Sequence, residues 1–212
     1  MRLDLPDAVR PLPLDDPDRA VAEFAGVIGD LRDVPAGAAA DLEALAAEGV
    51  DAALREGAVL MAVVTPEGAD PALLTGVALA VPPTWDLETA DRVRDSVEET
   101  GGPDVRETVV VESAVGPAVV AQRVPGVEQA REGRPAVVQL QAFIPDPASG
   151  RMLLLTLASP SSRGWAAHQA LFTRMVASAR PSGDTEPVQR PRPAPVPPPD
   201  DDESFENHTF RL

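Results

Sequence analysis

The chain has 212 residues, no Cys, no Lys and a formal net charge of −16. These features exclude disulfides, thiolate nucleophiles and Cys-ligated metals, and they argue against nucleic acid or an anionic membrane as partner, since both are bound through basic side chains. No apolar run reaches the length of a signal peptide core or a membrane helix, so we expect a cytoplasmic protein. Basic residues that are all Arg are typical of a high-GC genome, which suggests a bacterium.

The first quarter of the chain predicts one extended segment and two helices. Arg2–Leu5 alternates between polar and apolar residues and is expected to form a short edge strand. Residues 16–32 carry apolar side chains at helical spacing, and Asp15 or Asp16 can cap this helix. The same spacing recurs over residues 40–55, after a break rich in Pro and Gly.

The middle of the chain predicts six strands and one further helix. The first strand is almost wholly apolar, so we expect it to be buried on both faces. The helix over residues 86–99 is expected to turn Leu87 and Ala90 inward and to stop at Gly101. The six strands are expected at Gly57–Thr65, Leu73–Val81, Arg106–Glu112, Ala118–Val124, Pro135–Ile144 and Met152–Ser159.

A last helix is predicted over residues 163–179, with Ser161 or Ser162 as its cap. Its inward stripe consists of Trp165, His168, Phe172, Met175 and Ala179. Together these elements predict an α+β fold, in which an antiparallel sheet of about six strands packs with about four helices. They occupy a single domain over residues 1–180.

Residues 140–180 follow the order strand, tight loop, strand ending in small and polar residues, and Trp-containing helix. With the hairpin-like units before it, this order resembles the PsbP-like fold, which is also found in lipoproteins of the LpqN kind and in chaperones of secretion effectors. The resemblance covers roughly residues 57–180 and implies an antiparallel sheet that binds proteins. The two N-terminal helices and the long tail depart from the family, and no functional residue carries over.

A search for catalytic chemistry finds no residue set typical of an enzyme. His168 is interpreted as a structural residue, because the only other His lies in the tail. The serines around Ser161 are explained by helix capping, and the nucleophile pattern GxSxG is absent. Phosphate-binding motifs are absent as well. We therefore predict no catalytic, cofactor-binding or metal-binding residues and no cofactor, and we interpret Trp85 and Trp165 as core residues.

The C-terminal segment differs from the rest of the chain in composition. Residues 181–199 form a Pro-rich linker, and residues 200–212 begin with the acidic run Asp200–Glu203. Such composition predicts an extended or disordered tail, because it offers too little apolar surface to offset the entropy of ordering. Two Phe residues and a Leu at the end of such a tail suggest a short motif for a protein partner. The predicted partner-binding residues are Phe205, His208, Phe210, Arg211 and Leu212.

Three functions are compatible with the sequence. The first is a non-catalytic adaptor or chaperone-like protein, whose sheet or helical face holds one protein while the tail recruits another. The second is an immunity or inhibitor protein, whose acidic surface complements a basic partner. The third is a hydrolase-like enzyme that uses carboxylates or His168. The motif could also dock on its own domain, and the sequence leaves the oligomeric state open.

Overall fold

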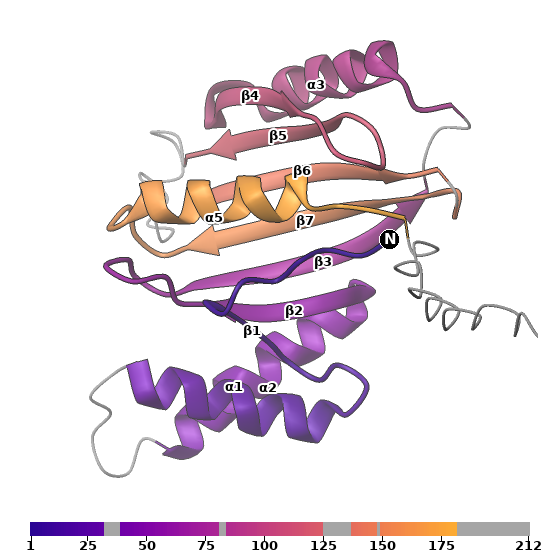
Figure 1. The fold of residues 1–212 in the computed structure, drawn as a ribbon. Helices are drawn as coiled ribbons and strands as arrows, with labels where there is room; N and C mark the ends of the chain where they lie inside the picture. Colours follow the sequence, from indigo (N-terminus) through magenta and orange to yellow (C-terminus); the bar gives the residue numbers. More distant parts are fainter. Residues whose placement is uncertain (32–38, 81–83, 125–136, 148, 182–212) are drawn as a thin grey trace, which may run out of the picture.

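The computed structural model describes residues 1–31, 39–80, 84–124, 137–147 and 149–181. These residues form one antiparallel sheet with helices on both of its faces (Figure 1). The α+β fold predicted from the sequence is therefore confirmed. The five predicted partner-binding residues of the tail lie outside the described residues.

The sheet has seven strands in the order β1-β2-β3-β7-β6-β5-β4, and every neighbouring pair is antiparallel. The six predicted strands are all present, with their ends shifted by a few residues, and a short seventh strand joins them. The strands are β1 (Val9–Pro11), β2 (Ala58–Val64), β3 (Ala72–Ala80), β4 (Val105–Val111), β5 (Ala118–Arg123), β6 (Val138–Asp146) and β7 (Arg151–Ser159).

Four α-helices are described, and all four are predicted by the sequence. Side-chain caps start two of them: the Asp16 carboxylate accepts from the Arg19 amide at 3.2 Å, and the Asp86 carboxylate accepts from the Thr89 amide at 2.8 Å. In the described ranges, no helix combines the length and the apolar character needed to cross a membrane. The helices are α1 (Pro17–Leu31), α2 (Ala39–Arg55), α3 (Leu87–Gly101) and α5 (Trp165–Ala177), and the 3-10 turn η1 (Gly102–Asp104) follows α3.

One face of the sheet, here called the α5 face, carries the main core. Alternate residues of β6 and β7 are buried there, as the period of two predicts. Phe172 and Met175 of α5 are fully buried against Leu155 and Leu157 of β7. Figure 1 shows α5 lying across the front of the sheet.

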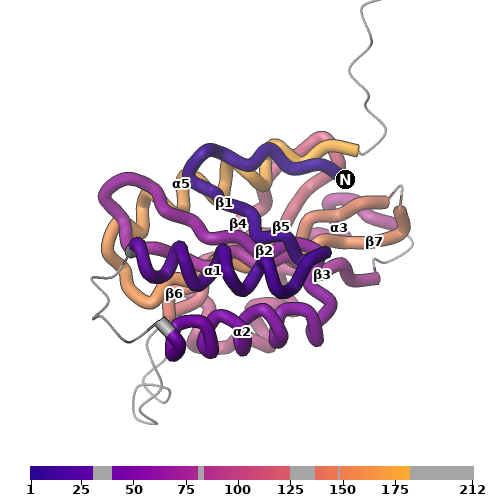
Figure 2. Tube along the Cα trace, turned by 90° about the horizontal axis from the view of Figure 1, so that it is seen from below, coloured from indigo at the N-terminus to yellow at the C-terminus, as the bar shows by residue number. Residues whose placement is uncertain are grey.

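Among the described residues, helices cover the opposite face only at its two margins. At one margin, Val50 and Ala53 of α2 pack on Met61 of β2, which is fully buried. At the other margin, α3 contacts β4 and β5. Figure 2 shows α2 and α5 on opposite sides of the sheet.

The predicted edge strand at Arg2–Leu5 is wrong, since the edge strand is β1. Two backbone hydrogen bonds flank β1 along the chain and hold it against β2. The Thr65 amide donates to the Ala8 carbonyl, and the Leu12 amide donates to the Met61 carbonyl. Leu3 and Leu5 instead pack against the core of the α5 face. Burial of these two apolar side chains, rather than pairing in the sheet, accounts for the alternation in this segment.

Two predictions about burial are also wrong. Val59 is 62% exposed, although its strand was expected to be buried on both faces. The pairing of β2 with β3 is irregular between Ala58 and Leu60, and β1 covers only the second half of β2. Leu87, the first residue of α3, is 58% exposed and does not turn inward as predicted.

Candidate functional site

His168 holds α5 to the turn before β3. Its side chain is fully buried, and its Nε2 atom lies 2.8 Å from the backbone carbonyl oxygen of Asp70. Because a carbonyl only accepts, Nε2 carries the proton and donates it. Nδ1 is buried and has no hydrogen-bond partner among the described residues.

Ser161 and His168 contact different parts of Asp70. The Ser161 hydroxyl donates to the Asp70 carboxylate at 2.5 Å, and Arg163 pairs with the same carboxylate at 2.9 Å. Helix α5 begins at Trp165 with Gly164 as its N-cap and has no side-chain cap, so the prediction that Ser161 or Ser162 caps it is wrong. Since His168 is hydrogen-bonded to neither this hydroxyl nor this carboxylate, the three residues do not form a Ser–His–Asp relay.

The remaining candidates for chemistry lie apart from one another. In the part of the chain that the structure describes, no group of three or more His, Asp or Glu residues is placed to hold a metal ion. Trp85 is half-buried and donates through Nε1 to the Pro117 carbonyl at 2.8 Å. Trp165 is half-buried against the main core. Neither Trp is an exposed anchor.

A candidate interaction surface lies between the two helical margins, opposite α5. We call it the open face, and its side chains are all half-buried although they lie on the three central strands β3, β7 and β6. They are Thr75, Val77, Leu79, Met152, Leu154, Thr156, Gln139, Gln141 and Phe143.

The register of the strands arranges these side chains in rows. Val77 is paired with Leu154, and Leu154 is paired with Phe143, so three apolar side chains form one continuous row across the strands. The neighbouring row is polar and consists of Thr75, Thr156 and Gln141. The open face thus offers an apolar stripe beside a row of hydroxyl and amide groups.

A hollow of about 230 Å³ extends the open face beneath α3. Its sheet side is formed by Gln141 and Phe143 of the open face, together with Arg123. Its helix side includes Ser96 and Thr100. The hollow gives the apolar row a recess at its β6 end.

Both helical margins of the open face are acidic. Helix α2 has four acidic residues and one Arg, a net charge of −3. Helix α3 has five acidic residues and two Arg, again a net charge of −3. Arg94 pairs with Asp91 and Asp95, both at 2.9 Å, and its hydrogen bond to Asp95 raises the pKa of its guanidinium. One of the two cations of α3 is therefore already neutralised within the helix.

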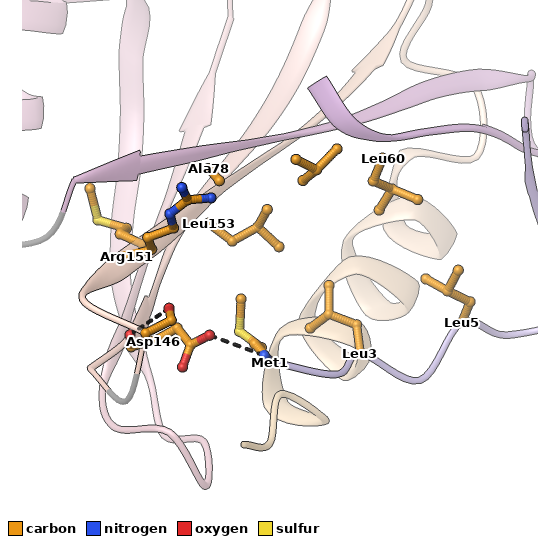
Figure 3. Close-up of a pocket in the computed structure, with 11 residues that line it drawn as sticks. Met1, Leu3, Leu5, Leu60, Ala78, Asp146, Arg151 and Leu153 are labelled. Carbon is orange, nitrogen blue, oxygen red and sulfur yellow. Dashed lines mark hydrogen bonds and ion pairs between the residues drawn. The ribbon is translucent and has the colours of Figure 1, made fainter. Parts of the chain in front are cut away.

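A separate pocket of about 330 Å³ lies at the end of the α5 face (Figure 3). We call it the N-terminal pocket. Leu3 and Leu5 line one side, and Leu60, Ala78 and Leu153 of the sheet line the other. The lining of the pocket is mostly apolar.

One end of the N-terminal pocket is charged. The Met1 ammonium group pairs with the Asp146 carboxylate at 3.0 Å, and both groups are nearly buried. Arg151 also lines this end, is exposed, and forms no ion pair with any described residue. The pocket therefore combines an apolar interior with a cation at its mouth.

Neither surface is predicted by the sequence. The sequence of β7 carries one signal of the open face, because Leu153, Leu154 and Leu155 are apolar on both faces of one strand; among the described residues, a helix covers only one of these faces. The N-terminal pocket gives no such signal, because it is formed by segments far apart in the chain. No protein-family model matches the chain, and no curated protein matches it.

Proposed function

We propose that this protein is a non-catalytic adaptor or chaperone-like protein that holds a segment of a partner protein on its open face. The observation that carries the proposal is the half-exposed apolar row Val77, Leu154 and Phe143 in the middle of a sheet. Contiguous apolar surface left open on a folded domain is typical of an interaction site.

The chemistry of the surface defines the partner segment. Apolar side chains of that segment cover the row of Val77, Leu154 and Phe143, and its polar groups meet Gln141, Thr75 and Thr156. Arg or Lys residues on its flanks face α2 and α3, each with a net charge of −3. Such charge complementarity speeds association and rejects acidic competitors.

The tail has the second role in this proposal. Residues 200–212, with Phe205, His208, Phe210, Arg211 and Leu212, act as a short motif that recruits another protein. We retain the resemblance to the PsbP-like fold, whose members mostly bind proteins, as part of the proposal.

The second candidate function is an immunity or inhibitor protein that covers a basic partner. The acidic margins α2 and α3 favour it, because they surround the apolar row with negative charge. A partner that binds chiefly by charge loses most of its affinity in high salt, whereas a partner held by the apolar row does not. The salt dependence of binding therefore separates the two candidates.

A displayed library of random peptides, selected on the full chain, tests the open face. We expect enrichment of peptides with apolar residues flanked by Arg or Lys. Replacing Val77 and Leu154 by Thr, which keeps the preference for strands, should lower their affinity at least tenfold. The control is Leu45→Thr on α2, which changes a Leu that is 54% exposed outside the open face. If the peptides bind the variant with Val77 and Leu154 replaced by Thr as tightly as they bind the unaltered chain, the proposal is refuted.

A further inference from the structure

The C-terminal segment leaves the described domain beside the N-terminal pocket. Arg2 and Arg180 form an antiparallel bridge, with N–O distances of 2.8 and 3.0 Å in the two directions. The Arg180 guanidinium also donates to both carboxylate oxygens of Asp4, at 2.6 and 3.0 Å. Arg2 and Asp4 flank Leu3, which lines the pocket. The tail is therefore anchored at the wall of the pocket.

This anchoring brings the terminal motif within reach of the pocket. Phe205 follows Pro181 by 24 positions. At about 3.1 Å per residue, the segment between them spans about 70 Å when fully extended, so its length does not limit contact with a pocket next to its anchor. A tether of this kind gives an effective concentration on the order of 1 mM. Weak affinity is then enough for the motif to be bound in a substantial fraction of molecules.

The chemistry of the segment matches the chemistry of the pocket. Phe205 offers an aromatic side chain to an interior formed by Leu3, Leu60 and Leu153. The acidic run Asp200–Glu203 directly precedes Phe205, and Arg151 is the exposed cation at the mouth of the pocket. An exposed cation beside an apolar pocket attracts an acidic segment that carries an aromatic side chain.

We propose that the N-terminal pocket is the docking site for Phe205 of the chain's own C-terminal segment. Docking is intramolecular, and the carboxylates of the acidic run pair with Arg151. The consequence for partner recruitment rests on the proposed function: a docked motif is withheld from other proteins, so a partner must compete with the pocket. The motif is therefore available to other proteins only when the pocket does not hold it.

Disulfide trapping tests this proposal, and the absence of native Cys makes it specific. Val59, at the mouth of the pocket, is 62% exposed and is replaced by Cys. Ser204, next to Phe205, is replaced by Cys in the same full-length chain. We expect an intramolecular disulfide in a glutathione redox buffer, measured by mass spectrometry, with an equilibrium yield that does not depend on protein concentration.

The matched control pairs Ser204→Cys with Thr173→Cys, an exposed position on α5 close to the point where the tail begins. A tail without a docking site meets Thr173→Cys at least as often as Val59→Cys. We expect the effective concentration of the Ser204→Cys thiol to be at least tenfold higher toward Val59→Cys than toward Thr173→Cys. The further substitution Phe205→Ala should remove this difference.

Equal effective concentrations at the two positions, or no effect of Phe205→Ala, would overturn the proposal. A disulfide that forms only between molecules would overturn it as well, because the occupant would then be a second copy. The result is independent of the peptide selection on the open face. If trapping fails while selected peptides still bind the open face, this inference is wrong and the proposed function stands. If trapping succeeds while no selected peptide binds the open face, docking in the N-terminal pocket stands and the proposed function is wrong.

Discussion

Gly164 sets the start of α5. Its φ of +71° is in the left-handed region, and a Cβ atom added there would lie 2.3 Å from the Cβ of Ala69 and 2.8 Å from the carbonyl oxygen of Gly68. The loop before α5 therefore packs directly on the turn between β2 and β3. This close approach, rather than a Ser cap, determines where the helix begins.

The substitution Gly164→Ala should destabilise the protein by about 3 kcal/mol, because left-handed strain of about 1–2 kcal/mol adds to the cost of overpacking. The matched control is Gly150→Ala, where φ is +65° but an added Cβ meets nothing within 4 Å. The Gly150→Ala variant should be destabilised only by the left-handed strain of about 1–2 kcal/mol. Urea unfolding monitored by circular dichroism measures both free energies of unfolding. Equal losses would show that the contact with Ala69 and Gly68 does not constrain the loop.

At the scale of residues, sequence reasoning succeeds where a local rule decides. Asp16, one of the two caps predicted for the first helix, accepts a hydrogen bond from the Arg19 amide. The capping prediction for Ser161 or Ser162 fails because α5 begins only at Trp165, where Gly164 packs on Ala69 of the distant turn before β3. No local pattern contains that information.

Among the elements, α3 begins at a cap that depends on charge. The Asp86 carboxylate accepts from the Thr89 amide, and this hydrogen bond lowers the pKa of Asp86. A lowered pKa in the folded state contributes stability above the ordinary pKa of about 3.9, and this stability is lost as the pH falls through the folded-state value. The start of α3 therefore weakens in acid.

Replacing Asp86 by Asn keeps a cap acceptor and removes the titrating group. We expect the difference in the free energy of unfolding between the unaltered chain and the Asn variant to shrink as the pH falls from 6 to 3. Urea unfolding at several pH values measures this difference. A difference that stays constant over this range would show that the charge of Asp86 does not stabilise α3.

At the scale of elements, hydrophobic periodicity predicts the four helices and six of the strands. It misses β1 because three residues are too few to show a period. Exposure at the ends of elements is missed as well. Leu87 has an apolar side chain at a helical position, yet 58% of its surface is exposed. Periodicity assigns a residue to a face, but only the tertiary arrangement determines whether that face is covered.

For the molecule as a whole, net charge is the dominant feature. The formal net charge is −16, so the carboxylates of the folded protein repel one another, and dissolved salt screens this repulsion. We expect Tm to rise by about 2–4 °C between low salt and 0.15 M NaCl, which corresponds to about 1 kcal/mol for a domain of this size. Differential scanning calorimetry measures the shift.

The control uses MgCl₂ at the same ionic strength. Screening alone gives the same Tm in both salts, whereas a much larger rise with magnesium would reveal a specific cation site. A Tm that is constant or falls with added NaCl would show that repulsion between carboxylates does not limit stability.

The bridge between Arg2 and Arg180 also determines how the molecule responds to force. Arg180 continues along the backbone into Ala179 and α5, and two backbone hydrogen bonds to Arg2 and the ion pair with Asp4 join it to the N-terminal segment as well, so a pull on the tail is shared between α5 and that segment. That segment lines the N-terminal pocket. A pull on the tail therefore acts on the wall of the pocket as well as on α5.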